Sequence, residues 1–134
     1  MFIDRLLNQT NAPLLEQMVR FTEQRAKLLG ENIVNASTPN YQQKDLSLAE
    51  FQQQLSEQVD RRRAATVPGQ VTIDPLTPEP QDAQGNILFH DRNNRSIESL
   101  MSDNAQNAML HNLMTELLRK QFTSIQDALK ERVT

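Results

Sequence analysis

The apolar residues of this chain fall into two long segments with helical spacing, one near each end. The first segment begins near Pro13, which suits the first turn of a helix because its missing N–H would have no partner there. Small and apolar residues then recur in alternating steps of four and three, a heptad pattern typical of a helix packed along one seam. We expect this helix over residues 13–37, because Thr38 precedes Pro39 and is disfavoured in the helical region. Its predicted seam consists of Leu15, Val19, Thr22, Ala26, Leu29, Ile33 and Ala36.

The last segment, residues 95–132, predicts a longer helix with the same alternation. Its heptads extend over about 54 Å at 1.5 Å per residue. Several seam positions are polar, which weakens a coiled coil but restricts its register and partners. Because this helix is the longer one, part of its apolar stripe has no partner inside the chain and is predicted to be interaction surface. Its predicted seam consists of Ile97, Met101, Asn104, Ala108, His111, Thr115, Leu118, Phe122, Ile125 and Leu129.

A short helix is predicted within residues 38–65. Ser47 and Glu50 have the spacing of a capping box, and Leu46 can pack on Phe51 as a hydrophobic staple. The arginines at 61–63 mark the expected end of this helix, since basic residues favour a helix C-terminus.

Residues 66–94 lose every helical pattern and are predicted to form an irregular linker or loop. Four of the six prolines lie between Pro68 and Pro80, which disfavours regular structure there. Residues 71–73 and 87–89 could each form a short strand. The predicted fold class is therefore mainly α, a single domain over residues 1–134. Its long N- and C-terminal helices pair as a coiled-coil-like bundle around a Pro-rich middle.

Composition and charge narrow the classes of function. A net charge of −3 gives too weak a field to indicate a nucleic-acid partner. The chain has no cysteine, which excludes disulfides and thiolate sites. No apolar run is long enough to span a membrane, and the N-terminus shows no cleavable signal peptide. His90 and His111 lack further ligands at metal-binding spacing, and no Gly-rich phosphate loop is present. We therefore expect that the protein is not an enzyme and that it binds no metal, cofactor or small-molecule substrate.

One motif stands out at the predicted end of the first helix, residues 32–41. Two asparagines share a helix face, where their amides can bond the backbone of the following turn, and a proline then ends the helix. The motif resembles the signature at the end of the N-terminal helix in the bacterial flagellar axial proteins. It departs mildly at Gly30, Val34 and Ser37. The matching residues are Asn32, Ile33, Asn35, Ala36, Thr38, Pro39 and Tyr41.

Within that family, the chain is most similar to the small proteins of the basal-body rod, and in particular to those of its proximal part. Lys44 and Asp45 follow the tyrosine as they do in those proteins. Residues 91–98, followed by Met101, are similar to a second stretch of the same members, and His111 stands where they have tyrosine. The resemblance covers both ends of the chain but not its Pro-rich middle.

The resemblance implies a structural subunit whose terminal helices stack helically into a hollow tube. Its partners would be other rod proteins and base components, and its location the periplasmic rod of the flagellum. Export would proceed through the flagellar type III apparatus without a cleaved signal. Phe2 and Leu6 have the spacing of an element that the export gate binds transiently. From the heptads alone, a helical coiled-coil adaptor or chaperone-like binding module is the alternative.

Overall fold

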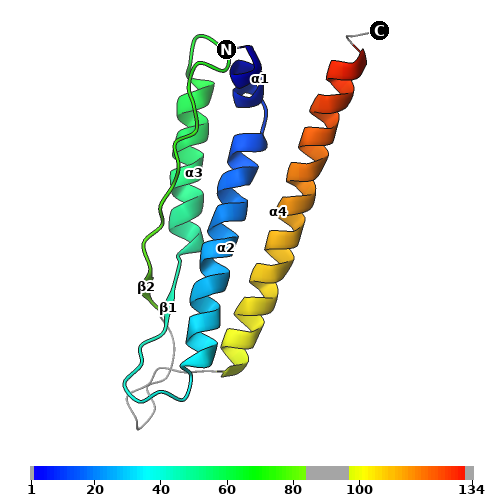
Figure 1. Ribbon diagram of the computed structural model, residues 1–134. Helices are drawn as coiled ribbons and strands as arrows, with labels where there is room; N and C mark the ends of the chain where they lie inside the picture. Colours follow the sequence, from blue (N-terminus) through cyan, green and yellow to red (C-terminus); the bar gives the residue numbers. More distant parts are fainter. Residues whose placement is uncertain (1, 84–96, 132–134) are drawn as a thin grey trace.

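The computed structural model describes residues 2–83 and 97–131 and is mainly helical, as predicted. The helices are α1 (Phe2–Gln9), α2 (Ala12–Val34), α3 (Leu48–Arg63) and α4 (Ile97–Glu131). Helix α2 lies between α3 and α4, and both run antiparallel to it (Figure 1). The short helix α1, which the sequence patterns did not predict, precedes α2.

Helix α2 begins as predicted but ends before residue 37. Its last residue is Val34, and Asn35 forms the C-cap with its N–H donating to Glu31 O at 3.0 Å. The Asn35 Nδ2 atom donates to the same carbonyl at 2.9 Å, so a side chain competes with continuation of the helix. The helix therefore ends three residues before the predicted boundary, at the Asn35 cap and not directly at Pro39.

Two short strands lie where no strand was predicted. Strand β1 (Lys44–Asp45) pairs antiparallel with β2 (Gln81–Asp82), with Lys44 opposite Asp82. Residues 71–73 contain no strand, in contrast to the prediction, and the predicted strand at 87–89 lies outside the described residues. The segment between α3 and β2 has no other regular structure and returns alongside α3 to reach β1 (Figure 1).

The core between α2 and α3 is built on two aromatic rings. Phe21 of α2 and Phe51 of α3 are stacked, with ring centroids 4.3 Å apart. Leu46 is buried in the same cluster as Phe51, as the predicted hydrophobic staple requires. Ser47 is the N-cap of α3, and its Oγ accepts from Glu50 N at 3.2 Å, as the capping-box spacing predicted.

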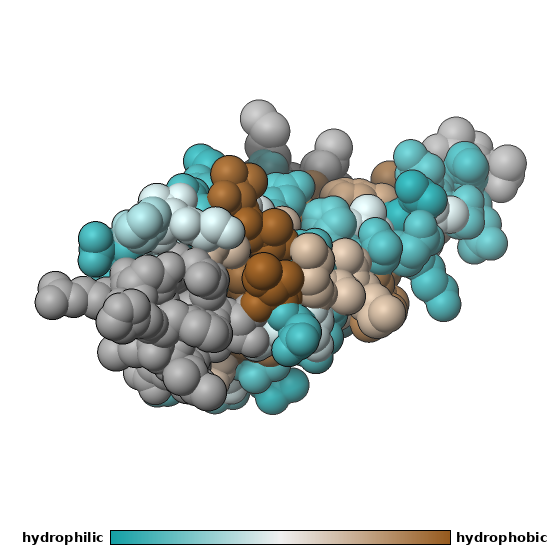
Figure 2. Space-filling model, turned by 90° about the horizontal axis from the view of Figure 1, so that it is seen from below, coloured by the Kyte–Doolittle hydropathy of each residue, from teal (hydrophilic) through white to brown (hydrophobic). Residues whose placement is uncertain are grey.

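Helix α4 packs on the side of α2 facing away from α3 (Figure 1). It has 35 residues against 23 in α2, and the difference of 12 residues is about 18 Å of helix. Viewed from the end where α2 stops and α4 starts, apolar side chains are gathered on the surface (Figure 2). The exposed large apolar residues at these two helix ends are Val34, Ile97 and Met101.

Candidate subunit interface

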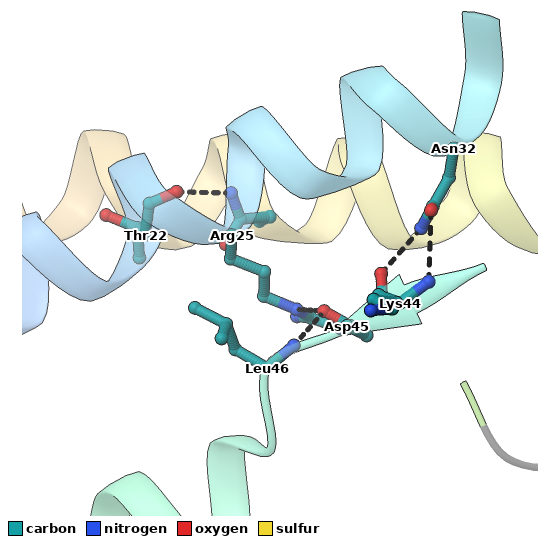
Figure 3. A network of polar contacts seen from close by, with 7 residues as sticks. Thr22, Arg25, Asn32, Lys44, Asp45 and Leu46 are labelled. Atoms are coloured by element: carbon teal, nitrogen blue, oxygen red, sulfur yellow. Dashed lines mark hydrogen bonds and ion pairs between the residues drawn. The ribbon is translucent and has the colours of Figure 1, made fainter. Parts of the chain in front are cut away.

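The end of α2 is fastened to β1 by the side chain of Asn32, which is 1% exposed. Its Nδ2 donates to Lys44 O at 2.7 Å, and its Oδ1 accepts from Lys44 N at 3.1 Å (Figure 3). The same Oδ1 also accepts from Tyr41 Oη at 3.1 Å. One amide therefore satisfies both backbone groups of Lys44. The motif does form a helix exit, but the partner of Asn32 is a residue twelve positions later and not the following turn.

The other motif residues divide into a local cap and exposed positions. Thr38 Oγ1 donates to Asn35 Oδ1 at 3.3 Å, which continues the cap on α2. Ala36 is buried, Ile33 is half-buried and Pro39 is exposed. The motif thus combines one buried polar contact with a solvent-facing turn.

Burial raises the pKa of the Tyr41 hydroxyl, and the charge of Glu31 adds to this shift. The raised pKa keeps the phenol protonated and able to donate to Asn32.

An ion pair joins the middle of α2 to the same strand. Arg25 donates from Nε and Nη2 to the two carboxylate oxygens of Asp45, at 2.8 and 2.7 Å (Figure 3). Asp45 Oδ1 also accepts from Leu46 N at 2.7 Å, so the carboxylate orients the chain entering α3. These contacts raise the pKa of Arg25 despite burial, and Asp103 on α4 adds to the shift. The pair therefore connects α2 to β1.

The face of α4 that contacts α2 differs from the predicted seam in its N-terminal half. The buried residues Leu100, Asn107 and Met114 follow a heptad spacing of seven, one position away from the predicted seam at its N-terminal end. His111, Thr115, Leu118 and Ile125 of the predicted seam are half-buried, whereas the other six are exposed. Successive helix positions differ in direction by about 100°, so a shift of one residue turns the N-terminal part of the predicted seam away from α2. The exposed predicted seam residues are Ile97, Met101, Asn104, Ala108, Phe122 and Leu129.

The predicted seam of α2 is more deeply buried than the predicted seam of α4. Thr22, Leu29 and Ala36 are buried. Leu15, Val19 and Ile33 are half-buried, and Ala26 is exposed beside a groove.

A polar cluster occupies the middle of this contact. Asn107 Nδ2 donates to Thr22 O at 2.8 Å, and the Thr22 hydroxyl lies 2.9 Å from His111 Nδ1. The Thr22 hydroxyl also lies 2.7 Å from Val19 O, and its single proton can be donated to only one of these two partners at a time. Among the described residues, Asn107 Oδ1 has no hydrogen-bond partner. The cluster restricts the register of α4 on α2 at a cost in stability.

Replacing Asn107 with leucine is expected to raise the free energy of unfolding by about 1 kcal/mol, because it removes a buried acceptor without a partner. An adjoining groove of about 320 Å³, lined by Ala26, Ala108 and Asn107 itself, leaves room for the larger side chain. Urea unfolding followed by circular dichroism measures the change. A fall in stability would contradict the view that this amide is retained for register.

A second apolar stripe on α4 has no neighbour within the described chain. Met109, Leu113 and Leu117 recur every four residues and are 72%, 54% and 40% exposed. They lie on a different side of the helix from Leu100 and Met114. Helix α4 thus carries one apolar face against α2 and another that is open to a partner.

The N-terminal residues Phe2 and Leu6 both belong to α1. Leu6 is half-buried, and the side chain of Phe2 lies outside the described part. Helix α1 lies at the opposite end of the bundle from the end of α2 that carries Asn32 (Figure 1). The patterns in the sequence did not indicate Phe21, Arg25 or Asn107 as contact residues. A signal for Asn107 was available, since it recurs seven residues from both Leu100 and Met114.

A pocket of about 400 Å³ lies beside β1, and its lining includes Asp45, Glu50 and Asp103. Within residues 2–83 and 97–131, no group of three or more His, Asp or Glu side chains could hold a metal ion. None of the described helices is long and apolar enough to cross a membrane. No protein-family model and no curated protein matches this chain.

Proposed function

We propose that this chain is a structural subunit of the proximal rod in the bacterial flagellar basal body, similar to the rod protein FlgB. In this proposal α2 and α4 pair as a coiled-coil-like bundle within each subunit. The open face of α4 packs against neighbouring subunits, so that repeated contacts build a hollow tube. The subunit leaves the cytoplasm through the flagellar type III apparatus and contacts other rod proteins and base components.

The observation that carries this proposal is the second apolar stripe of α4. Met109, Leu113 and Leu117 expose contiguous apolar side chains on a helix whose other face is already occupied by α2. Burying such side chains stabilises an assembly by about 25 cal/mol for each Å² removed from water. A stripe on one side of an elongated subunit also suits a contact between unlike surfaces, and such contacts extend when they do not close into a ring.

The helix-exit motif supports the flagellar assignment. Three residues that carry the resemblance in the sequence fasten α2 to β1: Asn32 bonds Lys44 and Tyr41, and Asp45 pairs separately with Arg25. They hold the chain reversal between α2 and α3 in one conformation. A subunit that must present the same surface to each neighbour needs this reversal to be rigid.

The experiment that tests the proposal is the isolation of basal bodies from the source organism, followed by mass spectrometry of the rod fraction. We expect this chain at a few copies per particle. Intact rods that lack the chain would overturn the proposal. A pull-down with the tagged chain would then test the alternative, a coiled-coil adaptor or chaperone-like module that uses the same stripe.

A further inference from the structure

Helix α1 is separated from α2 by a corner of two residues. Thr10 is hydrogen-bonded to both helices: its Oγ1 donates to Leu7 O of α1 at 2.7 Å and accepts from Ala12 N of α2 at 3.2 Å. Helix α1 therefore ends before α2 begins, and the two do not form one continuous helix. An isolated helix of eight residues is not stable in water, so α1 depends on contacts outside itself.

One such contact comes from Arg62 in the last turn of α3. Its Nη1 donates to Thr10 O at 2.8 Å and to Asn8 O at 3.4 Å, and its Nη2 donates to Asn11 Oδ1 at 3.4 Å. A guanidinium at the C-terminal end of α1 also complements the negative end of the helix dipole. The neighbouring arginines have other ion-pair partners, since Arg61 pairs with Asp74 and Arg63 with Asp60.

A second contact comes from the turn that follows α3. Gly69 has a φ of 76°, and a Cβ built on it would lie 2.7 Å from Arg5 O. The backbone of α1 therefore approaches this turn at a distance that only glycine allows. Gln9 Nε2 also donates to Pro68 O at 3.4 Å.

We propose that α1 is a latched segment, which docks on the end of α3 and leaves it as a unit while α2, α3 and α4 stay folded. Arg62 is the latch, and the turn at Gly69 is the seat. When docked, α1 keeps Leu6 and Leu7 half-buried, and its release makes both accessible to a partner. The inference stands apart from the proposed function, because it concerns only how the chain holds its own first helix.

Amide hydrogen exchange of the full-length chain, measured by mass spectrometry, tests this latch with three matched variants. We expect Arg62→Ala to accelerate exchange over residues 6–10 about tenfold or more, because hydrogen bonds from a charged donor are lost. Exchange over residues 21–32 of α2 stays within about twofold of the parent, since the latch does not touch that region. Arg61→Ala and Arg63→Ala, which remove the same charge from the same turn, leave residues 6–10 unchanged.

A further variant tests the contact between α1 and the turn at Gly69. Gly69→Ala is expected to accelerate the same amides, because the new methyl group collides with the backbone of Arg5. Tryptic cleavage after Arg5 should accelerate in parallel for Arg62→Ala and Gly69→Ala. The proposal is overturned if Arg62→Ala exchanges like Arg61→Ala over residues 6–10. It is also overturned if α1 and α2 lose protection together, since α1 would then not be a separate unit.

Discussion

Replacing Asn32 with alanine is expected to lower the free energy of unfolding by about 2–4 kcal/mol, because it leaves buried backbone groups without partners. The lost contacts are the donation to Lys44 O and the acceptance from Lys44 N and Tyr41 Oη. No water can replace the amide easily, since the side chain is 1% exposed. Urea unfolding followed by circular dichroism measures the loss.

Asn35→Ala is the matched control, because it removes the same side chain three residues later in the same motif. The Asn35 amide makes its contacts at the surface, with Glu31 O and the Thr38 hydroxyl. Its loss should lower the free energy of unfolding by less than about 1 kcal/mol, since water can take the place of both partners. Equal effects for the two variants would contradict the role assigned to Asn32.

The second large effect is expected at Leu113 on the open face of α4. Leu113→Asp should abolish incorporation into basal bodies and swimming motility, because it places a charge in the centre of the proposed subunit contact. The isolated chain should keep its stability within about 0.5 kcal/mol, since the side chain is already exposed to solvent. Motility in soft agar and the subunit content of purified basal bodies measure the effect.

Thr123→Asp provides the control for this substitution. Thr123 is an exposed residue of α4 outside the stripe, and its hydroxyl donates only to Arg119 O of the preceding turn. The same charge at this position should leave motility intact. A motile strain carrying Leu113→Asp would show that this face is not a subunit contact. Loss of motility in both strains would indicate that any added negative charge on α4 is harmful.

The elements that depend on neighbouring residues were predictable from the sequence. The start of α2 follows from Pro13, and the start of α3 follows from the hydrogen bond between Ser47 and Glu50. Both signals act within one helical turn, so no distant partner is needed to read them. Helix α1 escaped prediction because its eight residues are too few for a periodic signal and its support comes from Arg62 and Gly69.

The candidate site was predictable only in part. The motif of residues 32–41 indicated a helix exit, but the pairing of Asn32 with Lys44 requires the chain to turn back on itself. The bidentate pair of Arg25 and Asp45 likewise joins residues twenty positions apart. Contacts of this kind are set by how the elements pack, and residue spacing along a helix does not encode them.

By itself, the sequence determined that α2 and α4 are long amphipathic helices and that α4 has more apolar surface than one neighbour can cover. Only the tertiary structure decided which stripe of α4 meets α2. The apolar residues of α4 form more than one stripe with helical spacing, so periodicity alone does not choose between them. Burial of Leu100 and Met114, together with the bond from Asn107 to Thr22 O, selects one of them. The choice leaves Met109, Leu113 and Leu117 exposed, because a helix can turn only one side toward a single partner.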